Sequence, residues 1–84
     1  MALPNEEIPM TQQFKDILNR VNPDILEYHG HDLIQDGILD SLDVMNLVAE
    51  LEQVFSIEFD PDDVIPENFA SAKMIWVLVE KLQA

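Results

Sequence analysis

The chain is 84 residues long and has 17 acidic side chains against 4 basic ones, which gives a formal net charge of −13. This length predicts one small domain over residues 1–84, and the absence of cysteine excludes disulfides and cysteine-ligated metal sites. The negative charge repels nucleic acids and anionic membranes and attracts basic protein surfaces, although solubility alone would also explain it. No segment is apolar enough to span a membrane, so we expect a cytoplasmic monomer.

The first predicted element is a helix that follows residues 1–10, which we expect to be flexible. Thr11 is a candidate N-cap, and Asn22-Pro23 ends the helix. Apolar residues recur between them at helical spacing, at Phe14, Ile17, Leu18 and Val21. Residues 22–40 then form a long connection, and its apolar residues predict that it packs over the helices.

The second predicted helix runs from Ser41 to Phe55 and has apolar residues on two faces. The wider face can pack against a core and consists of Val44, Leu47, Val48, Leu51 and Phe55. The other face carries Leu42, Met45, Ala49 and Glu52. If the first face is buried, the second is exposed, and an adaptable Met beside acidic residues is typical of a protein docking patch. Burial of this helix on most sides of a small bundle is the alternative.

Asp40 is a better N-cap for this helix than Ser41. With Asp40 as the cap, Asp43 occupies the third helical position, where its charge complements the helix dipole. With Ser41 as the cap, Val44 would occupy that position and could not complete a capping box. The Ser41 hydroxyl then has no structural role, and it lies where free backbone amides favour a phosphate group.

The rest of the chain predicts an extended connector, one helical turn and a last helix. Residues 55–60 contain the only strand-like alternation, and a lone strand has no pairing partner. Asp60 and Pro61 begin a single turn that Pro66 ends. Residues 71–83 repeat the helical spacing. The predicted fold is all-α, a small four-helix bundle of three main helices and a short third one, with a long loop between helices 1 and 2.

Catalytic and metal-binding patterns are weak in this sequence. Ser41 does not lie in a G-x-S-x-G motif, and a catalytic triad would have to recruit His29 or His31 from the long connection. The segment "DPDDVIPEN" lacks the glycine and the terminal glutamate of an EF-hand loop. We therefore expect neither an enzyme nor a metal centre.

The segment "DGILDSLDVMNLVAELEQVF" resembles the attachment region of acyl carrier proteins, whose signature is an Asp-Ser-Leu triplet at the start of the second helix. The similarity covers most of the chain, since the predicted order of helices and the acidic balance also agree. The resemblance implies that Ser41 receives 4′-phosphopantetheine from coenzyme A and carries an acyl group as a thioester. It also implies that Asp40 assists the metal-dependent transfer.

The resemblance further implies which residues of this chain bind partner enzymes and which enzymes these are. Partner-binding positions would be Leu42, Met45, Asn46, Ala49 and Glu52. The partners would be a phosphopantetheinyl transferase and acyl-activating ligases or synthases with basic docking surfaces. We expect the cargo to be a fatty-acid-like or specialised acyl group, with the amino acid of a stand-alone aminoacyl or peptidyl carrier, such as a D-alanyl carrier, as the alternative. A non-carrier acidic helical adaptor is the second class of function.

Overall fold

The computed structural model describes residues 10–83, which contain four α-helices, two short 3-10 helices and no β-strand. The α-helices are α1 (Gln12–Val21), α2 (Asp24–Glu27), α3 (Ser41–Phe55) and α4 (Ala72–Gln83), and the 3-10 helices are η1 (Pro61–Asp63) and η2 (Pro66–Phe69). The all-α bundle predicted from the sequence is confirmed. Residues 1–9, predicted to be flexible together with residue 10, lie outside the described residues, whereas Met10 packs half-buried against the core.

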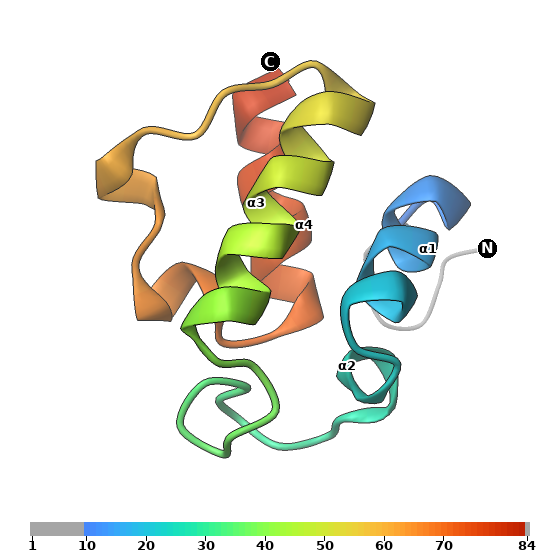
Figure 1. Ribbon diagram of the computed structural model, residues 1–84, viewed down its shortest axis with the longest axis vertical. Coiled ribbons are helices and arrows are strands. Elements are labelled where there is room, and N and C mark those ends of the chain that lie inside the picture. The colour runs from blue at the N-terminus through green and yellow to red at the C-terminus, as the bar shows by residue number, and fades with distance from the viewer. Residues whose placement is uncertain (1–9, 84) are drawn as a thin grey trace, which may run out of the picture.

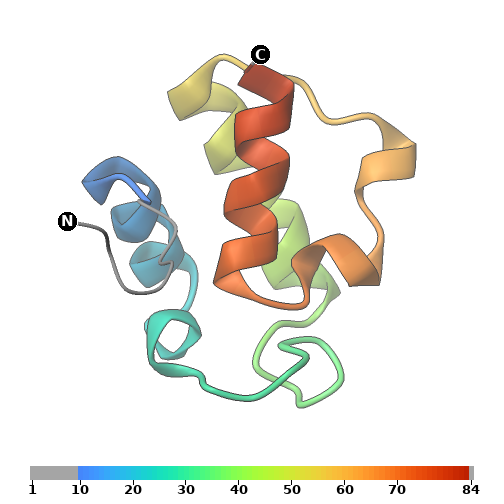
Figure 2. The ribbon, with the colours of Figure 1, turned by 180° about the vertical axis from the view of Figure 1, so that it is seen from behind.

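Three layers of chain make up the molecule. Helices α3 and α4 lie side by side in the middle, with α1 on one flank and the segment of η1 and η2 on the other (Figure 1). The view from behind shows the same arrangement, with the long connection crossing below the helices to reach the start of α3 (Figure 2). None of the helices between residues 10 and 83 has the length and the apolar character that a membrane span requires.

The connection between α1 and α3 contains one helical turn, α2, where the sequence predicts only a loop. Asn22 ends α1, and its side-chain oxygen then accepts a hydrogen bond from the N–H of Asp24 at 2.9 Å. Pro23 has a φ of −64°, which suits the start of a helix as well as the end of one. The chain therefore resumes a helical course at once and buries Ile25 against the core.

The core joins residues from every α-helix and from the loops. The buried apolar side chains are Phe14, Ile17, Leu18, Ile25, Leu33, Leu39, Leu47, Leu51, Phe59, Phe69, Ile75, Trp76, Leu78 and Val79. On α3 the predicted inner face is confirmed, with Leu47 and Leu51 buried and the other three members half-buried. The periodic apolar spacing of each helix is thus explained by one shared core.

Trp76 lies where α1, α3 and α4 meet. Its ring centroid is 4.9 Å from that of Phe14 in α1 and 6.1 Å from that of Phe55 in α3. Its indole N–H is buried and has no hydrogen-bond partner within residues 10–83. An unpaired buried donor costs about 1–3 kcal/mol, so the packing of this ring has to offset that penalty.

Tyr28 holds the first part of the long connection in one shape. Its hydroxyl donates a hydrogen bond to the carboxylate of Asp36 and accepts one from the N–H of Asp32 at 2.7 Å. Desolvation raises the pKa of Tyr28, and the hydrogen bond to Asp36 raises that pKa further. Gly30 passes so close to Tyr28 that a Cβ at this position would overlap the tyrosine hydroxyl.

The second part of the connection is tied to two other segments. The side-chain amide of Asn22 donates to the carbonyl of Ile38 at 2.8 Å, and the N–H of Leu33 donates to the carbonyl of Ala70 at 2.8 Å. Gly37 turns the chain with a φ of +81°, a conformation that favours glycine. These bonds fix the place at which the chain enters α3.

The segment between α3 and α4 follows its prediction except at one proline. Residues 57–60 are extended and contain no strand, and the N–H of Asp60 donates to the Asp63 carboxylate at 3.1 Å at the start of η1. Pro66, predicted to end this turn, instead opens η2. The fixed φ of proline suits a first helical position, so a second short turn follows.

Candidate functional site at the start of α3

Asp40 caps α3, as the sequence predicts. The N–H of Asp43 donates to the Asp40 carboxylate at 2.9 Å, and the N–H of Asp40 points back to the Asp43 carboxylate at 3.5 Å. These two contacts form a capping box, with Asp40 in an extended backbone conformation. Ser41 is therefore the first residue of the helix and not its cap.

The Ser41 hydroxyl is exposed and makes no hydrogen bond with any described residue. The backbone N–H groups of Ser41 and Leu42 likewise have no acceptor within residues 10–83, because the capping box satisfies only Asp40 and Asp43. Two free amides at the positive end of a 15-residue helix favour an anionic group. A phosphate ester on Ser41 fits this environment.

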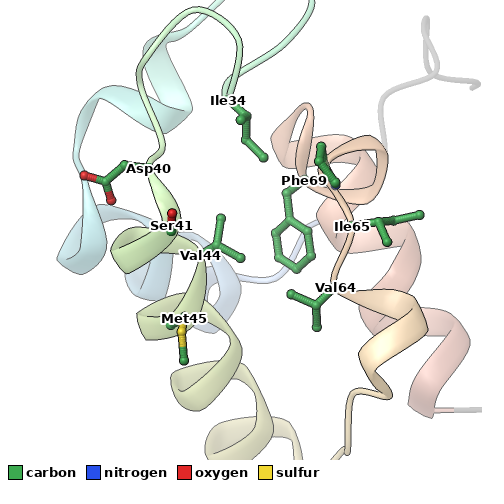
Figure 3. A pocket seen from close by; sticks show the side chains of 9 residues that line it. Ile34, Asp40, Ser41, Val44, Met45, Val64, Ile65 and Phe69 are labelled. Atoms are coloured by element: carbon green, nitrogen blue, oxygen red, sulfur yellow. The ribbon is translucent and has the colours of Figure 1, made fainter.

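A pocket of about 320 Å³ opens beside Ser41. One wall comes from the first turns of α3 and the other from the η1–η2 segment, with Ile34 of the long connection between them (Figure 3). The lining residues are Ile34, Asp40, Ser41, Val44, Met45, Val64, Ile65, Pro66 and Phe69. Apart from Asp40 and Ser41 the lining is apolar, so the pocket can hold an apolar part of a group attached to Ser41.

The nine residues that line this pocket include one acidic side chain, Asp40, and no histidine. His29 and His31 are exposed on the long connection, and neither belongs to the lining. Among residues 10–83 no group of three or more His, Cys, Asp or Glu side chains could hold a metal ion.

The five residues predicted to bind partners fall into three places. Leu42 and Met45 are 69% and 67% exposed, and Met45 also forms the rim of the pocket beside Ser41. Asn46 and Ala49 are exposed as well but line a groove between α1 and α3 that is bordered by Arg20. Their exposure leaves all four available to a partner.

Glu52 differs from the other four, because its carboxylate is already used. It accepts a hydrogen bond from the N–H of Phe59 at 2.9 Å and is half-buried. Phe59 is part of the core, so this bond fastens the connector after α3 to the helix. Helical spacing places Glu52 on the exposed face but cannot show that the chain folds back over it.

Replacement of Glu52 by alanine should therefore destabilise the fold, by about 1.5–3 kcal/mol, because the N–H of Phe59 loses a charged acceptor. The matched control is Glu50→Ala, which removes a surface ion pair. In this pair a Glu50 carboxylate oxygen lies 2.9 Å from the guanidinium of Arg20, and its loss should lower the free energy of unfolding by about 0–1 kcal/mol. Both variants remove one negative charge from α3. Urea unfolding monitored by circular dichroism measures both, and equal losses would contradict a special role for the bond to Phe59.

Comparison with known proteins agrees with this geometry. The family model described as "Phosphopantetheine attachment site" matches residues 9–71. The D-alanyl carrier protein of Lactococcus lactis subsp. lactis (strain IL1403) is 32% identical over 74 residues, which cover 86% of this chain and 94% of that protein. The D-alanyl carrier protein of Streptococcus equi subsp. zooepidemicus (strain MGCS10565) is 32% identical over 60 residues, covering 71% of this chain and 76% of that protein.

No solved structure matches the chain with comparable significance. The family match spans well over half of the chain and includes the capped start of α3 with its free hydroxyl and the pocket beside it. The chain therefore belongs to the phosphopantetheine-attachment family of carrier proteins, which hold a covalently bound 4′-phosphopantetheine arm.

Proposed function

We propose that Ser41 is the residue to which the phosphopantetheine arm is attached and that residues 1–84 act as one non-catalytic carrier domain. The observation that carries the proposal is the exposed Ser41 hydroxyl beside two unused backbone amides at the capped start of α3. Membership of the attachment family favours this role over that of a non-carrier adaptor. The chain would then present a tethered cargo to enzymes and perform no chemistry of its own.

Attachment would proceed by phosphoryl transfer to Ser41 from coenzyme A. The hydroxyl oxygen forms a bond to the phosphorus that carries pantetheine, the pyrophosphate bond of coenzyme A breaks, and adenosine 3′,5′-bisphosphate leaves. The hydroxyl proton passes to a base of the transferase. We propose that Asp40, whose carboxylate lies next to Ser41 and caps the helix, assists this step.

For the cargo we propose an amino acid, with D-alanine first. Support comes from the relatives named D-alanyl carrier proteins, one of which aligns over 94% of its own length. A short cargo is also compatible with the space beside Ser41, which is bordered by the exposed side chains of Met45 and Ile65. An aminoacyl group on the thiol of the arm would remain accessible to a second enzyme.

A fatty-acid-like acyl chain is the second candidate, and the apolar lining of the pocket favours it. Seven of the nine lining residues are apolar, among them Val44 and Phe69, and none of these seven could recognise the amino group of an amino acid. An acyl chain would gain by leaving water for such a surface. The two candidates therefore rest on different observations and can be separated by loading.

A loading assay distinguishes the two cargoes. The holo protein is offered D-alanine with ATP and a carrier-directed D-alanine ligase, or decanoate with ATP and an acyl-carrier synthetase, and intact masses are compared. We expect a gain of one D-alanyl group that hydroxylamine removes, as a thioester requires, and no gain on apo protein. A decanoyl gain without a D-alanyl gain would overturn the aminoacyl proposal.

A further inference from the structure

The hydroxyl of Tyr28 joins the two ends of a tight turn formed by residues 32–36. It accepts a hydrogen bond from the N–H of Asp32 at 2.7 Å and donates one to the carboxylate of Asp36. Desolvation, together with the bond to Asp36, raises the pKa of Tyr28, so the hydroxyl stays protonated and able to donate near neutral pH. We call these two hydrogen bonds the Tyr28 clamp.

The turn held by the Tyr28 clamp forms part of the pocket beside Ser41. The Asp32 carboxylate accepts hydrogen bonds from the N–H groups of Ile34 and Gln35, at 3.0 and 3.1 Å. These bonds fix the backbone of Ile34, whose side chain lies at the pocket between α3 and the η1–η2 segment (Figure 3). The position of Ile34 therefore depends on Asp32, and that of Asp32 depends on Tyr28.

The same turn leads directly into α3. The carbonyl of Leu33 accepts hydrogen bonds from the N–H groups of Ile38 at 2.9 Å and Leu39 at 3.0 Å. Leu39 is buried in the core, and Asp40, the cap of α3, follows it. A continuous series of contacts thus connects the Tyr28 clamp to the cap of α3.

We propose that Tyr28 is a positioning residue for the site at Ser41, and that through the clamp it holds Ile34 and the approach to α3 in the arrangement that a modifying enzyme binds. The proposal rests on the proposed attachment at Ser41. Tyr28 does not line the pocket itself, so it acts through the turn. Without the clamp the turn would populate several conformations, and the enzyme would bind only the fraction of molecules in which the turn is in place. The apparent affinity then falls in proportion to that fraction.

Three variants break the clamp in different ways. Tyr28→Phe removes the hydroxyl and keeps the ring, and Asp36→Ala removes the acceptor. Gly30→Ala leaves both groups in the chain, but its Cβ would overlap the Tyr28 hydroxyl and displace it. The φ of Gly30 is not positive, so alanine suits the backbone at this position.

Two further variants serve as controls. Asp36→Asn removes the same charge as Asp36→Ala but keeps an oxygen that can accept a hydrogen bond from the Tyr28 hydroxyl. Thr11→Ala removes the N-cap of α1, whose hydroxyl accepts a hydrogen bond from the N–H of Phe14 at 3.3 Å. It therefore weakens the fold at a place away from the turn.

The methyl NMR spectrum of the unmodified protein tests the position of Ile34 directly. We expect the three clamp-breaking variants to shift the δ1-methyl signal of Ile34, whereas the two controls leave it in place. The signal of Ile75, which is buried in the core, should stay unchanged in all of them. An unmoved Ile34 signal in Tyr28→Phe, or equal shifts in the two Asp36 variants, would overturn the positioning role.

Modification by coenzyme A, magnesium and a purified broad-specificity phosphopantetheinyl transferase tests the consequence at Ser41. We expect the clamp-breaking variants to raise the KM for the protein about 3- to 10-fold and to change kcat less than about 2-fold, because the capping box beside Ser41 stays intact. Gly30→Ala added to Tyr28→Phe should raise KM little further, since the same clamp is already lost.

A KM of Tyr28→Phe equal to that of the wild type, or a rise of the same size in Thr11→Ala, would refute the role of Tyr28 at this site. Absence of modification in the wild-type protein would instead refute attachment at Ser41. The Ile34 signal does not depend on attachment, so the two failures are distinguishable.

Discussion

Replacement of Ser41 by alanine should abolish modification by coenzyme A and a phosphopantetheinyl transferase. The variant lacks the oxygen that would form the ester, so the expected loss is complete and not partial. Its fold should be unaffected, because the Ser41 side chain is exposed and unbonded and alanine is a good helix former. We expect the free energy of unfolding to change by no more than about 0.5 kcal/mol. Intact-mass measurement of wild type and variant gives the result.

Ser71 provides the matched control for this experiment. Its hydroxyl accepts a hydrogen bond from the N–H of Met74 at 3.1 Å, directly before α4. Ser71→Ala should therefore lose about 1 kcal/mol of stability, as expected for an N-terminal cap, and should keep full modification. A mass gain in Ser41→Ala, or its loss in Ser71→Ala with the fold intact, would contradict attachment at Ser41.

Replacement of Met45 by glutamate should slow modification about 10-fold or more while leaving the helical content unchanged. Met45 is 67% exposed at the rim of the pocket beside Ser41, so a charge here disturbs a partner's apolar contact and not the core. Loss of one such contact corresponds to about 1–2 kcal/mol of binding energy, which is about 10-fold for each 1.4 kcal/mol. The measurement is kcat/KM at low and high salt, together with circular dichroism.

Val77→Glu is the control for this variant. Val77 is 45% exposed on α4 and does not line the pocket beside Ser41, so the substitution adds the same charge at a distant apolar position. Its effect on kcat/KM should be less than about 2-fold. Because the lost contact at Met45 is apolar, its effect should persist at high salt. Unfolding of Met45→Glu, or an equal effect of Val77→Glu, would refute the predicted docking role.

The regular parts of the fold could be predicted from local residue patterns. The start of α3 follows from Asp40 and Asp43, which satisfy one another's backbone groups three residues apart. The end of α1 at Val21 follows from Asn22-Pro23. Both signals act within a few residues, so the local sequence is sufficient to predict these two helix ends.

Features that depend on how the chain folds back could not be predicted in this way. Proline is compatible with either end of a helix, so only the neighbouring contacts decide that Pro23 precedes α2 and that Pro66 opens η2. The bond between Glu52 and the N–H of Phe59 joins residues that helical periodicity treats separately. The pocket beside Ser41 likewise requires the η1–η2 segment to lie opposite α3, which no local pattern specifies.

The contacts of Trp76 allow the folding of this protein to be followed by tryptophan fluorescence. The chain has a single tryptophan, and its indole ring is 4% exposed between Phe14 of α1 and Phe55 of α3. Emission from this ring therefore reports whether the three long helices are docked, without any label. Because the indole N–H is buried and has no partner within residues 10–83, its exposure to water on separation of the helices would shift the emission to longer wavelength.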